Sequence, residues 1–324
     1  MRPVTSTSDE AVASLSAFDL LAGVPEEELA QLARTTRRRQ FRVGQAIWRQ
    51  GDDSEELAFV LAGRVSISLQ LPGDATVEVS SVGPGEVMGE MGIIDGGRRL
   101  VGATAVEPTT VMVLGRADYT ALVSRRHPTA FAIKRRIAHI ACARLRGQYT
   151  ALAESLGDGP PPDAATDAEL EFRGPPDSRY VRRLASFRAF DSLALWGFLT
   201  AGRYALCPPG RTLVAEGTAS PACYLTINGA VEKVIVRGGR RIRVGLAGPG
   251  LAFGYESMID GGPSPVTAIT RERTLVLALP TAAFERLFDG ERPESHVFLD
   301  VIHRDLAGSL RQALRPHARL AVSL

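Results

Sequence analysis

The strongest constraint on the fold is that the chain of 324 residues repeats itself. The stretch VMGEMGIIDGGRRL, residues 87–100, matches AFGYESMIDGGPSP, residues 252–265, without a gap. Upstream, glycines at identical internal spacings pair in the same way: Gly44 with Gly210, Gly51 with Gly217, and Gly63 with Gly229. One residue is lost between the two blocks, in a stretch typical of a hairpin turn, where a change in length is best tolerated. The repeat predicts two domains of one fold.

Each copy contains short β-branched runs separated by Gly, Pro and Asp, a pattern typical of a small antiparallel barrel or sandwich. In the first copy these runs are LAFVL, VSISL, TVEVSSV and TTVMVL. Helical patterns flank them, over residues 25–35 in front and 117–156 behind. We therefore expect a mainly β fold with flanking helices, of the α+β class, built from two antiparallel, jelly-roll-like β-rolls in tandem.

The domain limits follow from local composition. Residues 157–180 are rich in Pro, Gly and Asp, which indicates a linker. We expect an N-terminal domain over residues 1–156 and a C-terminal domain over residues 181–324.

Overall composition narrows the function classes. The hydrophobic fraction of 45% is typical of a globular chain, and a net charge of +2 gives little reason to expect a nucleic-acid partner. No stretch reaches the roughly 18 apolar residues that a membrane-spanning helix needs, and the N-terminal residues do not read as a signal peptide. Three cysteines without metal-type spacing favour a reducing compartment. We expect a cytoplasmic protein without a membrane span.

Signatures of catalysis and metal binding are missing from the sequence. The five histidines form no His-x-His pair, and there is no nucleophile elbow, Walker loop or pair of catalytic carboxylates. We expect neither an enzyme nor a protein with a bound metal or cofactor.

The loop GEMGII in the first copy carries the clearest chemical signal. Gly89, followed by a helical turn after a strand, leaves backbone N–H groups that suit an anion such as a phosphate. Arg99 lies beyond the DGG turn, where its forked donors can reach phosphate oxygens. Arg98 is the adjacent alternative for this role. A carboxylate such as Glu90 repels phosphate and accepts hydrogen bonds from hydroxyls, so phosphate and ribose together suggest a nucleotide.

The run MGEMGIIDGGRRLVGATA, residues 88–105, resembles the phosphate-binding cassette of the cyclic nucleotide-binding domain family; we call it the first cassette. The resemblance implies a β-roll in which Glu90 binds the ribose 2′-hydroxyl and Arg99 binds the cyclic phosphate. It also implies two further groups of ligand-binding residues, Gly89, Met91 and Leu100 in the cassette, and Ile67, Val79 and Val82 on strands. The strand residues are core residues first and ligand contacts second.

The resemblance favours cAMP as the ligand and leaves cGMP as the alternative. Members of the family that select cGMP tend to use a Thr or Ser hydroxyl. Leu100 and Gly102 stand here where other members often carry such side chains.

The second copy keeps the glycines of the cassette and loses its charges. Tyr255 stands in the place of Glu90, and Ser264 in the place of Arg99. We expect little or no nucleotide binding there. A shift in register that brings Glu256 into the place of Tyr255 is the alternative.

These features predict a cyclic nucleotide sensor of the bacterial receptor or regulatory-subunit type. The first roll would bind the ligand, and its flanking helices would signal to the second roll and to an unidentified protein partner, with a homodimer as an additional arrangement. The alternatives are a scaffold that binds partner proteins but no nucleotide, and a transcriptional regulator. We do not expect the terminal helical stretch to form a DNA-binding domain with its own core.

Overall fold

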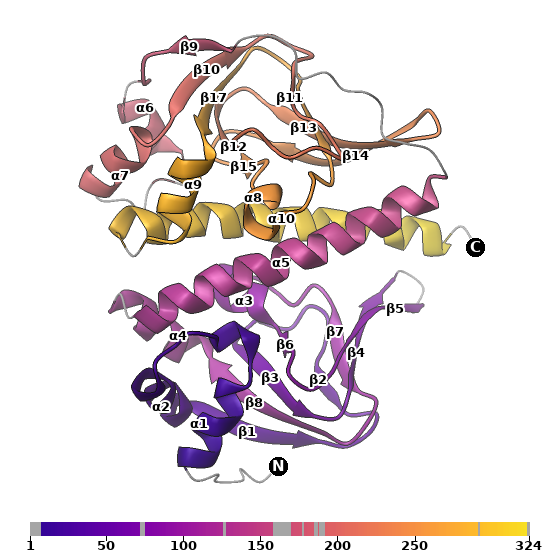
Figure 1. The fold of residues 1–324 in the computed structure, drawn as a ribbon. Helices are drawn as coiled ribbons and strands as arrows, with labels where there is room; N and C mark the ends of the chain where they lie inside the picture. Colours follow the sequence, from indigo (N-terminus) through magenta and orange to yellow (C-terminus); the bar gives the residue numbers. More distant parts are fainter. Residues whose placement is uncertain are drawn as a thin grey trace. The chain divides into compact units, whose positions relative to one another are not determined.

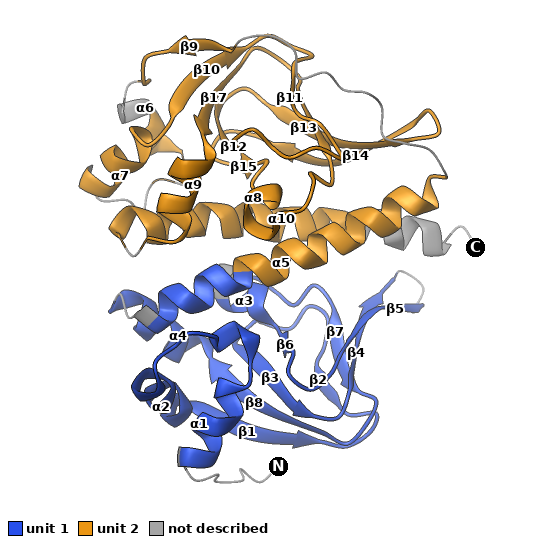
Figure 2. Ribbon diagram, in the orientation of Figure 1, with its two compact units in different colours: residues 1–137, 318–324 blue, residues 138–317 orange. Residues whose placement is uncertain are grey.

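The computed structural model describes residues 8–71, 75–125, 128–157, 170–176, 178–184, 187, 192–290 and 292–322. The chain forms two compact units, one of residues 1–137 with 318–324 and the other of residues 138–317 (Figure 2). Each unit contains one β-roll, which we call the first and the second roll. The expected tandem of mainly antiparallel β-rolls with flanking helices is therefore confirmed (Figure 1).

The first roll consists of two four-stranded antiparallel sheets, in the orders β1-β8-β3-β6 and β2-β7-β4-β5. Its strands are β1 (Thr36–Phe41), β2 (Ala46–Trp48), β3 (Glu56–Ala62), β4 (Val65–Gln70), β5 (Thr76–Val82), β6 (Val87–Met88), β7 (Gly102–Ala105) and β8 (Thr109–Gly115). Its helical segments are α1 (Ser8–Ser16), η1 (Asp19–Leu21), α2 (Glu26–Thr35), α3 (Glu90–Asp95), α4 (Arg116–Ser124) and the beginning of α5 (Pro128–Ser155).

The core of the first roll lies between its two sheets. Ala58 and Val60 of β3 meet Ile67 of β4 and Ala103 of β7 in one buried cluster. β3 is buried on its other face as well, where Phe59 packs edge-on against Phe18, which lies just before η1, with ring centroids 5.0 Å apart. A strand covered on both faces reads as a continuous apolar run, which explains the sequence LAFVL.

The second roll repeats this arrangement, with sheets in the orders β15-β12-β17-β10-β9 and β11-β16-β13-β14. Its strands are β9 (Glu171–Arg173), β10 (Arg203–Cys207), β11 (Thr212–Val214), β12 (Cys223–Asn228), β13 (Val231–Arg237), β14 (Arg240–Ala247), β15 (Ala252–Phe253), β16 (Thr267–Thr270) and β17 (Thr274–Leu279). Its helices are α6 (Ser178–Arg183), α7 (Ser192–Leu199), α8 (Glu256–Asp260), α9 (Thr281–Phe288) and α10 (Pro293–Val322), together with the C-terminal part of α5.

The segment expected to be a linker contains regular structure. β9 extends the first sheet of the second roll by pairing Phe172 with Ala205 of β10, and α6 begins inside the same segment. Residues 158–169 of the expected linker lie outside the described residues. The compact units divide at Ile137 inside α5, whereas the sequence predicts the first domain to end at residue 156. A continuous helix gives the sequence no signal for such a division.

Candidate ligand-binding site

The first cassette follows β6 with a turn that only glycine fits. Gly89 has φ +82°, in the left-handed region, and forms the N-cap of α3. A Cβ atom built on Gly89 would lie 2.3 Å from Nη1 of Arg99 and 2.9 Å from the backbone oxygen of Glu56. Glycine is therefore required here both for the backbone angle and for the close approach of the arginine.

Arg99 is folded back into the protein, with only 7% of its surface exposed. Its Nη2 donates a hydrogen bond to the backbone oxygen of Glu56 at 2.5 Å, and its Nη1 donates to that of Gly89 at 3.4 Å. The guanidinium carbon lies 3.9 Å from the centroid of the Trp48 ring, within cation–π range. Its Nε has no hydrogen-bond partner within the described part of the chain. The guanidinium is thus held rigidly and keeps donor capacity for an anion.

Glu90 is the first residue of α3 and is 2% exposed. Burial lowers the pKa of Arg99, while the carboxylates of Glu56 and Glu90 raise it. An arginine remains charged in such surroundings because its pKa starts above 12. The site therefore combines a buried cation with forked donors and a buried carboxyl group that accepts hydrogen bonds, which suits a ligand with one phosphate and nearby hydroxyls.

The other predicted ligand-binding residues lie in two places. Met91 and Leu100 are half-buried residues of the first cassette, next to Glu90 and Arg99 in sequence. Ile67 on β4 and Val82 on β5 belong to the core cluster of the first roll, and the partly buried Val79 on β5 packs against it. Their roles in binding remain predictions.

The structure separates the two neighbouring arginines of the cassette. Arg98 is exposed, and its Nη1 lies 3.4 Å from the backbone oxygen of Gly51. Arg99 points inward. The placement agrees with the choice of Arg99 over Arg98.

Two residues of the site were missed by sequence reasoning. Trp48 stacks on the guanidinium, and Glu56 supplies a backbone oxygen to it. The tryptophan could have been found from the sequence, because an aromatic ring beside a phosphate-binding loop can hold an arginine by a cation–π contact. The contact with Glu56 left no signal in the sequence, because a backbone oxygen is present whatever the side chain is.

The second cassette, residues 253–270, keeps the left-handed glycine of the first and carries different side chains, and its helix begins one residue later. Gly254 has φ +74°, and Tyr255 forms the N-cap of α8 in the place of Glu90. Ser264 is buried, and its hydroxyl donates to the backbone oxygen of Val266 at 2.8 Å. Glu256 is the first residue of α8 and follows Tyr255, while the left-handed Gly254 and Gly261 keep the places of Gly89 and Gly96. The observed register therefore shows the substitution and not the shift.

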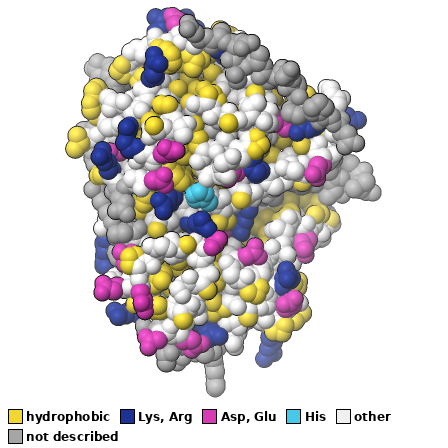
Figure 3. Space-filling model, in the orientation of Figure 1, with side chains coloured by type: hydrophobic (Ala, Val, Ile, Leu, Met, Phe, Trp, Pro, Cys, Tyr) yellow, Lys and Arg dark blue, Asp and Glu magenta, His cyan; other side chains and the backbone are white. Residues whose placement is uncertain are grey.

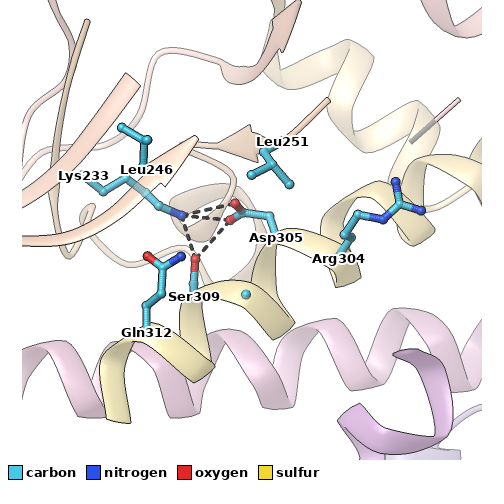
Figure 4. Close-up of a pocket in the computed structure, with 8 residues that line it drawn as sticks. Lys233, Leu246, Leu251, Arg304, Asp305, Ser309 and Gln312 are labelled. Atoms are coloured by element: carbon cyan, nitrogen blue, oxygen red, sulfur yellow. Dashed lines mark hydrogen bonds and ion pairs between the residues drawn. The ribbon is translucent and has the colours of Figure 1, made fainter. Parts of the chain in front are cut away.

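A small cavity of about 30 Å³ lies in the second roll beside α10. Its lining residues come from β13, β14, the turn before β15, and α10 (Figure 4): Lys233, Leu246, Leu251, Arg304, Asp305, Gly308, Ser309 and Gln312. The volume is enough for about one water molecule.

The described residues show neither a cluster of metal ligands nor a helix that could span a membrane. None of their His, Cys, Asp and Glu side chains gather in groups of three or more that could hold a metal ion. Within the same residues, no helix has both the length and the apolar character needed to cross a membrane. On the face shown in Figure 3, acidic and basic side chains are interspersed.

The fold and the cassette agree with a comparison of the chain with protein families. The cyclic nucleotide-binding domain model matches residues 38–126 and 206–291, together more than half of the chain. The chain therefore belongs to the cyclic nucleotide-binding domain family, with one domain in each roll.

Individual relatives show the same similarity. The cyclic AMP receptor protein of Thermus thermophilus is 34% identical over 122 residues, 36% of this chain and 56% of the relative. Lysophospholipase nte1 of Aspergillus fumigatus is 33% identical over 89 residues, 28% of this chain and 6% of the relative. In a solved structure, the regulatory domain of Toxoplasma gondii PKA with cAMP is 20% identical, with 87% of this chain and 92% of that chain covered and a TM-score of 0.35. The chain thus spans about half the length of the first relative and a small part of the second.

Proposed function

We propose that the protein is a cytoplasmic, non-enzymatic sensor that binds cAMP in its first roll and signals through α5 to the second roll and to a protein partner. The observation that carries the proposal is the buried guanidinium of Arg99 beside the buried carboxyl group of Glu90. A cation that is buried beside a carboxyl group in a short glycine-rich segment is costly to keep without a ligand that uses it.

The present partners of Arg99 explain how a ligand can be accepted. The guanidinium donates to two neutral backbone oxygens, those of Glu56 and Gly89. An anionic phosphate oxygen is a stronger acceptor than a neutral carbonyl, so it competes well for these donors. Glu90 then accepts from a ribose hydroxyl at the other end of the same ligand.

The helix α5 provides a route for the signal because it belongs to both compact units. In its N-terminal part, Thr129 donates to the carboxylate of Glu28, and Arg136 donates to Asp19 at 2.8 Å, which ties the helix to elements of the first unit. In its C-terminal part, Arg146 contacts α8 of the second roll. The N-terminal part of α5 is therefore bonded to elements of the first unit, and its C-terminal part to an element of the second.

The contact with α8 is specific. The Nε and Nη2 atoms of Arg146 each lie 2.7 Å from a carboxylate oxygen of Asp260, and Nη1 donates to the backbone oxygen of Pro263. A ligand that binds one position of α5 better than another shifts the population by that difference in affinity. The second cassette, without its nucleotide-binding charges, serves in this proposal as the receiver of the movement.

The test is a calorimetric titration of the full chain with cAMP and with cGMP. We expect binding at one site per chain, tighter for cAMP, and a loss of about 100-fold in affinity for Arg99→Ala, because truncating one member of a desolvated charged contact has effects of this size. Arg98→Ala is the matched control, since this exposed neighbour should leave the affinity unchanged. If the unmutated chain binds neither nucleotide, the protein is a scaffold and the proposal is wrong.

A further inference from the structure

The second roll places a lysine and a tyrosine at two positions that correspond to predicted ligand-binding positions of the first. Lys233 on β13 pairs with Ala268 in the same register in which Ile67 on β4 pairs with Ala103. Lys233 therefore occupies the place of Ile67, as Tyr255 occupies the place of Glu90.

Both side chains bind the same carboxylate, that of Asp305 on α10. The Nζ atom of Lys233 lies 3.0 Å from Oδ2 and 3.3 Å from Oδ1 of Asp305, and the hydroxyl of Tyr255 donates to Oδ2 at 2.6 Å. Ser309, one turn further along α10, accepts a hydrogen bond from Nζ at 2.7 Å (Figure 4). We call these four residues the latch.

The latch is buried, and its polar groups are hydrogen-bonded to one another. Its members are at most 3% exposed. An isolated lysine or aspartate would be very costly to bury, and each is stabilised here by an opposite charge and by at least one hydroxyl. Burial alone lowers the pKa of Lys233, but the charge of Asp305 and the hydrogen bond to it raise it above its ordinary value. Lys233 is therefore charged, and its ion pair with Asp305 binds α10 to the roll.

The first roll lacks the charged residues of the latch at the corresponding described positions. The spacing between the two copies is constant from the cassette through β7 and β16, β8 and β17, to the first residues of α5 and α10. At this spacing the residue of α5 that corresponds to Asp305 is Ile140, which cannot bind a cation. The latch is a property of the second copy alone.

We propose that the carboxylate of Asp305 is an internal ligand of the second roll, which holds α10 closed against β13 and α8 where the related roll would bind a nucleotide. Two positions of the former site have been converted from ligand contacts into holders of this carboxylate. The second roll then has one fixed state, in which its cassette presents Asp260 to α5. The first roll, without a latch, keeps the freedom to respond to a ligand.

Amide hydrogen exchange on the full chain without nucleotide tests the proposal, so its outcome does not depend on whether the first roll binds cAMP. We expect Asp305→Ala to increase exchange along α10 and α8 by at least about tenfold. Arg304→Ala, an exposed neighbour on the same helix, should change exchange in these segments less than twofold. Exchange in α10 that stays within twofold of the unmutated chain in Asp305→Ala would overturn the proposal.

A second pair of variants decides the matter if Asp305→Ala unfolds. The double variant Lys233→Met with Asp305→Leu removes both charges and fills the space with apolar atoms, which commonly preserves the stability of a buried pair. We expect it to fold and to protect α10 better than Asp305→Ala does. Equal loss of protection in both variants would show that Asp305 does not act through Lys233. Binding of two cAMP molecules per unmutated chain would also overturn the proposal, because Asp305 would then not exclude a nucleotide.

Discussion

The two rolls differ in chemistry while their cassette turns are the same. In the first roll, the backbone N–H of Gly51 donates to the oxygen of Arg99 at 2.8 Å, and the N–H of Arg99 donates to the oxygen of Asp52 at 2.7 Å. In the second roll, the corresponding bonds of Ser264, to Gly217 and Thr218, are 2.9 Å and 2.7 Å long. The turn therefore needs neither the arginine nor its charge.

The two rolls use different buried charged residues at corresponding places. The first roll buries Glu90 and Arg99 in its cassette. The second roll has neither of these and buries an ion pair of Lys233 on β13 with Asp305 on α10. A β-roll of this fold can thus offer its buried charges to a ligand or use them to bind its own terminal helix. A few side chains decide between the two. The following predictions test this contrast.

The largest effect is expected for Lys233→Ile, which gives the second roll the residue of the first. It leaves the carboxylate of Asp305 buried without its cation, which should lower the free energy of unfolding of the second unit by about 3–5 kcal/mol. The two tryptophans report the units separately, because Trp48 lies in the first and Trp196 in the second. Urea titration of Lys233→Ile in a Trp48→Phe background measures the second unit.

The control is Ile67→Val in the first roll, which removes one methylene at the matched position. It should cost about 1 kcal/mol, read from Trp48 in a Trp196→Phe background. If Lys233→Ile costs no more than this, the lysine is not held as an essential partner of Asp305.

A smaller effect is expected for Gly89→Ala in the first cassette. The new Cβ would lie 2.3 Å from Nη1 of Arg99 on a backbone with φ +82°, so the variant should lose about 2 kcal/mol of stability and bind cAMP at least about tenfold more weakly. Gly85→Ala is the matched control, since Gly85 has φ +84° and open space around its Cβ position. It should lose about 1 kcal/mol and keep its affinity. Equal affinities in the two variants would mean that Arg99 need not occupy its observed place.

Much of this contrast could be predicted from the sequence, and the part that could not has a physical reason. The paired glycines and β-branched runs predicted the rolls, because turns and strands are local. The exchange of Glu90 for Tyr255 predicted a changed second cassette. The latch was invisible, because Lys233 and Asp305 are far apart in the chain and a lysine in a strand ordinarily faces water. Likewise, the packing of α5 on α8 depends on tertiary contacts that leave no mark on a continuous helix.

A third variant, Arg146→Ala, tests the contact between α5 and the second cassette. It removes a two-pronged ion pair whose side chains are 25% and 20% exposed, so we expect a loss of about 1–2 kcal/mol in the second unit. A double-mutant cycle with Asp260→Asn isolates the pair: the two single losses should exceed the loss of the double variant. Additive losses would contradict a direct coupling. In the proposed sensor, Arg146→Ala should leave cAMP affinity nearly unchanged and reduce the change in α8 exchange caused by cAMP.

The smallest effect is expected for Glu256→Gln, and its sign is opposite. Burial raises the pKa of Glu256, and the charge of Lys233 only partly reverses this. Neither carboxyl oxygen has a hydrogen-bond partner within the described residues. As pH rises above the ordinary value of 4.5, the unfolded chain loses this proton first, so the folded state binds more protons and the group's contribution to stability falls with increasing pH.

Glutamine has no proton to lose, so its contribution to stability does not fall with increasing pH. Glu256→Gln should therefore stabilise the second unit by about 1 kcal/mol at pH 7 and by less near pH 4.5. Urea titration at a series of pH values, followed through Trp196, measures this. Glu272→Gln, at an exposed position, should change neither the stability nor its pH dependence. A destabilised Glu256→Gln at pH 7 would mean that Glu256 is ionised and shares Lys233 with Asp305. The second roll would then have an ionised carboxylate one residue after the position that corresponds to Glu90. The two cassettes would differ in where the carboxylate lies, and not in whether one is present.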